Sequence, residues 1–220
     1  MAQKKTLKTT QFSVKIEGYT EGVAKLVGIY ADANYLADSA RISPDGSFVF
    51  KKPEGYQEGL FYVLMPDQAN FQFLIANGEN NFNIKTVRGK IVLSLTAENS
   101  SENQLFFDNQ KYQVRLEERF NELLKERKKY LIGSPRYDSL QKAQENLLVE
   151  RDSEVTKLIQ NFGNTFFTKF KLAGQNPKFR FSTLTNGVID TAATMRNYRE
   201  DWWNDVDFSD ERLVRTPVFF

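Results

Sequence analysis

The spacing of apolar residues changes near residue 98, and this change constrains the fold more than any other feature of the sequence. Before it, apolar and polar residues tend to alternate, as over residues 12–16 (Phe-Ser-Val-Lys-Ile), which is the period of a half-buried strand. After it, apolar residues recur every three or four positions, which is the period of an amphipathic helix. The sequence therefore predicts an α+β protein with a β domain over residues 1–98 and a helical domain over residues 99–220.

The first region contains short predicted strands separated by turn signals. Pro44-Asp45-Gly46 predicts a hairpin, because Pro fixes φ for a turn and Gly accepts a positive φ. Strands are expected at residues 12–16, 24–30, 38–42, 47–50, 60–65, 71–76, 81–85 and 91–95. Short strands at this spacing are typical of an antiparallel β-sandwich.

Two long helices are expected in the second region. Ser101 to Gln104 fits a capping box, in which Gln104 returns to the cap, and the helix behind it is expected to run to a stop at Gly133. Ser134 followed by Pro135 predicts the start of the next helix, which ends near Gly163. The short link predicts a long antiparallel helical hairpin. Shorter helices are expected at 165–173, 190–203 and 210–214, and Phe162, Phe166, Phe167 and Phe170 are expected in the core.

The chain has no Cys and no His, which excludes most catalytic chemistry. It can form no thiolate, no imidazole base and no thiolate- or histidine-bound metal site. Glycine-rich phosphate loops are also absent, so no cofactor, no metal and no enzymatic activity are expected. With 30 Lys and Arg against 28 Asp and Glu, the charge is too balanced for nucleic-acid binding. No apolar run reaches the roughly 18 residues of a transmembrane segment.

Acidic residues gather beside the two tryptophans: Asp201, Asp205, Asp207, Asp210 and Glu211. A carboxylate pair beside aromatic rings is found in glycosidases, so an unrecognised carboxylate hydrolase is one hypothesis. The same residues serve equally well as helix caps and loop carboxylates around a buried Trp pair. Their spacing does not match a calcium-binding loop, and we favour the structural interpretation.

The residue pattern also resembles a known family. Residues 12–18, 38–40, 45–50 and 59–62 resemble the N-terminal β-domain of unknown function that precedes thioredoxin-like (AhpC/TSA-type) domains. Residues 166–174 and 202–217 look like the second, helical domain of those proteins. The resemblance implies an exported protein of the periplasm or cell envelope of Gram-negative anaerobes, followed by a thioredoxin-like domain with a CxxC dithiol. This sequence contains no CxxC and ends on an apolar segment, so we expect it to be cut from a longer protein.

The resemblance implies a non-catalytic accessory region of an exported thioredoxin-like thiol:disulfide oxidoreductase. Its partners would be the missing C-terminal thioredoxin-like domain and a client protein. Interaction residues are expected to be exposed aromatics, and the candidates are Trp202, Trp203, Phe219 and Phe220. Three Asp-Ser/Thr-apolar tripeptides, at 38–40, 138–140 and 190–192, look like O-glycosylation sites of such exported proteins and favour export.

A second hypothesis is a stand-alone ligand-binding β-sandwich of the cell envelope, with a glycan or a lipid as ligand. It predicts an aromatic-lined pocket within residues 1–98. The candidates for this pocket are Tyr19, Tyr30, Tyr35, Tyr56 and Tyr62.

Overall fold

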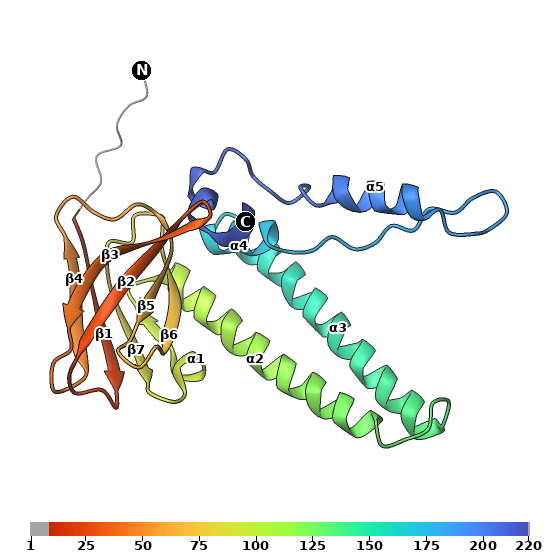
Figure 1. The fold of residues 1–220 in the computed structure, drawn as a ribbon, viewed down its shortest axis with the longest axis horizontal. Helices are drawn as coiled ribbons and strands as arrows, with labels where there is room; N and C mark the ends of the chain where they lie inside the picture. The colour runs from red at the N-terminus through yellow and green to blue at the C-terminus, as the bar shows by residue number, and fades with distance from the viewer. Residues whose placement is uncertain (1–8, 220) are drawn as a thin grey trace.

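A computed structural model describes residues 9–219 and confirms the α+β class: two four-stranded sheets are followed by helices (Figure 1). The first sheet has the strand order β4-β1-β7-β8, with β1 (Thr10–Glu17), β4 (Ser47–Lys52), β7 (Asn81–Val87) and β8 (Thr96–Glu98). The second has the order β3-β2-β5-β6, with β2 (Val23–Tyr30), β3 (Ala33–Arg41), β5 (Gly59–Leu64) and β6 (Asn70–Ile75).

The strand pairs are antiparallel except for one. β1 lies antiparallel to β4, with Phe12 opposite Phe50, and parallel to β7, with Phe12 opposite Phe82. Parallel pairing needs a crossover connection, and here the chain builds the whole second sheet between β1 and β7. The crossover therefore returns β7 to the first sheet in the direction of β1.

The turn at Pro44-Asp45-Gly46 is present, but the predicted hairpin is wrong. The turn joins β3 in one sheet to β4 in the other, so the two strands are not partners in one ladder. Gly46 has φ +80, and its amide and carbonyl bond to the carbonyl of Ser43 and the amide of Ile16. A Cβ atom at Gly46 would lie 2.3 Å from the carbonyl oxygen of Ile16. The turn is thus pressed against β1, which directs the chain across to the other sheet.

Alternating residues of both sheets form the core of the sandwich. Phe12, Val14 and Ile16 of β1 are fully buried, as the period-2 pattern predicts. The ring of Phe12 lies 4.9 Å from that of Phe82 in its own sheet and 5.0 Å from that of Phe73 in the opposite sheet. These ring contacts join the two sheets through their aromatic residues.

The predicted helical hairpin is confirmed. α2 (Ser101–Arg127) runs away from the sandwich, and α3 (Pro135–Phe162) runs antiparallel to it, back toward the sandwich (Figure 1). α2 ends six residues before Gly133, because the intervening residues form turns. Shorter elements follow: α4 (Phe166–Ala173), α5 (Thr191–Asp201), and the 3-10 helices η1 (Glu211–Arg215) and η2 (Pro217–Phe219). Among residues 9–219, no helix combines the length and apolarity that a membrane crossing requires.

The strand expected just before α2 is wrong. Residues 91–95 do not form a strand, because Ile91–Ser94 is one helical turn, α1, and β8 follows at Thr96–Glu98. The hydroxyl of Ser94 accepts a hydrogen bond from the amide of Val87 at 2.9 Å, which fixes this turn beside β7. This helical turn positions the next residue, Leu95, which is fully buried.

The start of α2 is capped differently from the predicted capping box. Ser100, one residue earlier, is the N-cap and accepts a hydrogen bond from the amide of Asn103 at 3.1 Å. Gln104 does not return to the cap, because its side chain accepts a hydrogen bond from the amide of Ala97 at 3.0 Å. A distant carboxylate, Glu79, instead accepts from the amide of Ser101 at 2.9 Å. The free amides of α2 are therefore satisfied partly from the sandwich.

The sandwich and the helices share one hydrophobic core. Phe107 of α2, Phe166 and Phe167 of α4, and Leu213 of η1 are buried in the same cluster as the sheet residues. Of the four phenylalanines expected in this core, Phe162 is exposed, because it ends α3 just before the turn into α4. The domain boundary near residue 98 stays a prediction.

Candidate interaction surface

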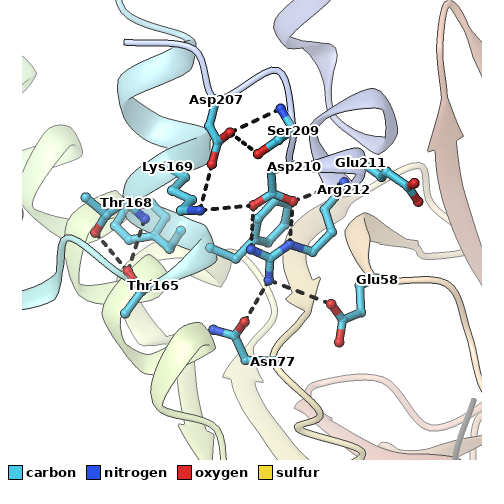
Figure 2. Close-up of polar contacts among 12 residues, drawn as sticks. Glu58, Asn77, Thr165, Thr168, Lys169, Asp207, Ser209, Asp210, Glu211 and Arg212 are labelled. Carbon is cyan, nitrogen blue, oxygen red and sulfur yellow. Dashed lines mark hydrogen bonds and ion pairs between the residues drawn. The ribbon is translucent and has the colours of Figure 1, made fainter. Parts of the chain in front are cut away.

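Arg212 fixes the C-terminal segment, which carries the candidate aromatic residues, to the sandwich. Its guanidinium forms two hydrogen bonds to Asp210, from Nε to Oδ1 at 2.7 Å and from Nη2 to Oδ2 at 2.5 Å (Figure 2). Nη1 donates to Oδ1 of Asn77 at 2.7 Å and lies 3.7 Å from Glu58 of the sandwich. The same guanidinium lies 4.4 Å from the centre of the Phe166 ring. Arg212 thus links three parts of the chain through a planar, bidentate group.

Lys169 of α4 joins this network from the helical side. Its Nζ lies 2.9 Å from Oδ2 of Asp207 and 3.6 Å from Oδ2 of Asp210 (Figure 2). Asp207 also accepts hydrogen bonds from the amide and hydroxyl of Ser209, at 3.1 and 2.6 Å. Hydrogen bonds from Ser209 and then from Lys169 lower the pKa of Asp207 to about 2. Asp207 is therefore ionised and holds the loop against α4.

Glu102 supplies the third support of this region. Its side chain is buried, and its two carboxylate oxygens accept hydrogen bonds from the amides of Phe166 at 2.9 Å and Phe167 at 3.0 Å. The amide group of Asn77 donates to the same carboxylate. A negative charge at the first free amides of α4 is favourable, because those amides and the helix dipole are positive.

An aromatic cluster lies on this fixed base, and we call it the C-terminal aromatic cluster. It consists of Trp203, Phe208 and Phe219, whose ring centres are 5.8 to 6.3 Å apart. Phe219 packs partly against the core, whereas Trp203 is 44% and Phe208 is 69% exposed. The structure therefore brings together two of the four candidate residues, Trp203 and Phe219. Phe220 lies outside the described residues.

The adjacent tryptophans belong to different clusters. α5 ends at Asp201, and Trp202 points to Tyr198 one turn earlier, with ring centres 5.7 Å apart. Tyr198 stacks in turn on Phe179 at 4.4 Å. Trp203 faces Phe208 and Phe219 instead. The end of the helix thus separates two side chains that the sequence placed on one surface.

Three of the five acidic residues near the tryptophans pair with basic side chains. Asp201 accepts two hydrogen bonds from Arg180, at 2.5 and 2.7 Å, while Asp207 pairs with Lys169 and Asp210 with Arg212. The contact with Arg180 lowers the pKa of Asp201, so this carboxyl, like Asp207, holds no proton to donate as a general acid. The arrangement favours caps and ion pairs over a hydrolase dyad. Within residues 9–219, no group of three or more His, Cys, Asp or Glu is arranged to hold a metal ion.

The five tyrosines of the ligand-binding hypothesis have different environments. Tyr19 and Tyr56 are buried in the core, and their hydroxyls donate to Asp67 at 2.6 Å and Asp38 at 2.5 Å. Burial and the contact with Asp67 raise the pKa of Tyr19 to about 12. These two side chains are committed to the sandwich itself. Tyr30 and Tyr35 are exposed on β2 and β3, and the hydroxyl of Tyr62 donates to Asn34.

Several residues of this site were not predicted from the sequence. Phe208 is a single aromatic residue in a polar loop, and that contrast is the only local signal for its exposure. Arg212 lies in the stretch 210–217, which the family resemblance includes, but nothing local indicates its contact with Asn77. Glu102 was interpreted as part of a capping box for its own helix, whereas it caps α4.

A comparison with protein families found a match for the sandwich region. Residues 11–106, which cover the sheets and the first turn of α2, match the family described as "Domain of unknown function (DUF4369)". The matched region covers less than half of the chain, and the structure as a whole is of the α+β class. A comparison with curated proteins found no match.

The solved structures that align with part of the chain include the crystal structure of (S)-allantoin synthase. It has 9% sequence identity and a TM-score of 0.34. The alignment covers 44% of this chain and 45% of that protein, so the match spans less than half of either. A likeness at this level carries no argument about fold or function.

Proposed function

We propose that this chain is a non-catalytic accessory region of an exported thioredoxin-like thiol:disulfide oxidoreductase, and that its C-terminal aromatic cluster docks the thioredoxin-like domain. The observation that carries the proposal is that the aromatic side chains of the cluster are exposed while the loop that bears them is held in place. Trp203 and Phe208 are exposed, while Arg212 and Lys169 hold their loop in place through ion pairs. Aromatic side chains that are already fixed lose little conformational entropy on binding, which makes them effective anchors.

The chemistry of the chain supports a non-catalytic accessory role. Thiol exchange needs a thiolate, and the sequence has no Cys, so the reactive dithiol would come from the docked domain. Asp207 and Asp210, beside the aromatic cluster, form ion pairs with Lys169 and Arg212, which suits a structural base. Export to the periplasm or cell envelope belongs to the same proposal and rests on the family resemblance of both halves of the chain. Recognition of a client protein is the competing use of the same surface.

The two tryptophans provide a direct test. In a Trp202→Phe variant, Trp203 is the single indole and reports on the C-terminal aromatic cluster. Adding a thioredoxin-like domain from a protein of the resembling family should shift its emission to shorter wavelength as the ring loses water. In the matched Trp203→Phe variant, the single indole is Trp202, just after the end of α5, and its emission should stay constant. Unchanged emission from Trp203, or an equal shift from both tryptophans, would contradict the proposal.

Binding variants provide a second measurement. Phe208→Ser removes the most exposed ring of the cluster and should weaken binding of the domain by about tenfold or more, as expected for an anchor residue. Leu131→Ser is the matched control, because Leu131 is 85% exposed at the far tip of the helical hairpin. If both substitutions have the same effect, the aromatic cluster is not the docking surface.

A further inference from the structure

Residues 175–202, which we call the arm, form a structural unit apart from the sandwich. Figure 1 shows α5 and the loop before it extending away from the sheets. The tip is a tight turn, closed by a bridge between Thr183 and Ile189. Lys178 connects the arm to α3 through an ion pair with Asp152, at 2.6 Å. The arm is thus attached to the molecule at its base and projects from it.

Polar contacts hold the inside of the arm together. Thr194 is buried, and its hydroxyl accepts a hydrogen bond from the amide of Ser182 at 3.0 Å. The side chain of Asn197 donates to the hydroxyl of Ser182 at 3.0 Å, and Arg180 pairs with Asp201. These contacts join the extended segment before the tip to α5. The interior of the arm is therefore polar, which is the reverse of an ordinary folded unit.

The apolar side chains of the arm lie on its outside. Four rings form a continuous row from Phe181 to Phe179, Tyr198 and Trp202, with neighbouring centres 4.4 to 6.1 Å apart. The large exposed apolar residues are Phe179, Phe181, Leu184, Val188, Ile189, Met195 and Trp202, which are 37–67% exposed. At roughly 200 Å² for each large side chain, they leave on the order of 700 Å² of apolar surface in water. Monomeric proteins rarely expose more than this in one region.

We propose that the arm is a dimerisation element, and that the arm of a second copy of this chain covers its aromatic row. Two arms packed against each other would bury about 1,400 Å² in total, which is the size of a standard stable interface. The charges of the arm also suit a second copy. It carries four basic and three acidic residues, so two identical arms meet without strong repulsion. A strongly acidic or basic partner has no corresponding charged patch to recognise.

This dimer would use a different surface from the proposed docking of a thioredoxin-like domain. The arm contains Trp202, whereas the C-terminal aromatic cluster contains Trp203, and the two tryptophans face different neighbours. Either proposal can therefore fail while the other holds.

The test is the oligomeric state of the chain in solution. Sedimentation velocity and light scattering should show a dimer at a protein concentration of about 0.1 mM, which is well above a micromolar dissociation constant. The double variant Phe181→Ser with Val188→Ser should raise the dissociation constant about 100-fold or more, because each dimer loses four apolar side chains. Both side chains are more than half exposed, so the variant should fold normally, as circular dichroism can verify.

A matched control separates the arm from general surface apolarity. The double variant Leu131→Ser with Ile132→Ser removes two side chains that are each 85% exposed at the hairpin tip. It should leave the dimer unchanged. The proposal is overturned if the natural chain sediments as a monomer, if the arm variant still dimerises normally, or if the control variant loses the dimer. Binding of another protein or of lipid by a monomeric chain would also overturn it.

Discussion

The carboxylate of Glu102 accepts a hydrogen bond from the backbone amide of Phe166 at 2.9 Å, although the two residues are 64 positions apart. Glu102 lies in the first turn of α2, and Phe166 begins α4. A side chain of one helix therefore caps another helix, and the second oxygen of Glu102 bonds to Phe167. This contact lies under the network of Arg212, which in turn fixes the exposed aromatic loop.

Loss of the Glu102 carboxylate should destabilise the whole protein. Glu102→Ala leaves the amides of Phe166 and Phe167 without acceptors in a buried place, so the free energy of unfolding should fall by about 2–4 kcal/mol. Urea unfolding followed by circular dichroism measures the change. Glu118→Ala, at an exposed position of the same helix, should stay within about 0.5 kcal/mol of the natural chain. Equal effects of the two substitutions would contradict the capping role.

The planar fork of Arg212 should matter more than its charge. Arg212→Lys keeps the positive charge but loses one of the two bonds to Asp210 and the flat contact with Phe166, so stability should fall by about 1–3 kcal/mol. Arg196→Lys, on the exposed side of α5, is the control and should have little effect. The urea midpoints of the two variants measure this difference. An Arg212→Lys protein with an unchanged midpoint would contradict the role of the guanidinium contacts.

Asp207 should make the stability of the folded chain depend on pH. Its pKa is lowered to about 2 in the folded chain, below the ordinary value of 3.8, because Ser209 and Lys169 favour the ionised form. A lowered pKa contributes stability that is present above the unfolded pKa and is lost as the pH falls through the folded value. The urea midpoint should therefore decrease from about pH 5 to about pH 2. Asp207→Asn should show a shallower decrease, and an identical pH profile in both proteins would contradict the assignment.

The shared core should make the sandwich and the helices unfold together. Phe107 of α2 is fully buried in the cluster that contains the sheet residues, so Phe107→Ala should cost about 3–5 kcal/mol. Far-ultraviolet circular dichroism and tryptophan fluorescence should report the same, lowered transition. Separate transitions for the two signals would show that the regions fold as independent domains, as the change of pattern near residue 98 predicts.

Features that depend on neighbouring residues were predictable from the sequence. The alternation in β1 predicts which of its side chains are buried, and Ser134 with Pro135 correctly predicts the start of α3. Ser134 accepts a hydrogen bond from the amide of Tyr137, as an N-cap does. These rules work because period and capping act within one or two turns of the chain.

Features of the candidate surface were only partly predictable. Trp203 and Phe219 were expected there as exposed aromatics, and the structure places their rings 6.3 Å apart. Phe208 joins them without a motif that indicates it. Trp202 was expected beside Trp203, but its direction depends on where α5 ends and on the ring of Tyr198.

The sequence by itself determined most of the strands and helices, their approximate limits and the chemistry that a chain without Cys and His cannot perform. Only the tertiary structure decided that β7 lies parallel to β1, that residues 91–94 form a helical turn, and that Glu102 caps α4. The physical reason is the range of the interactions. Hydrophobic period and caps are local, whereas strand partners, buried charge contacts and the direction of an exposed ring depend on residues brought together from distant parts of the chain.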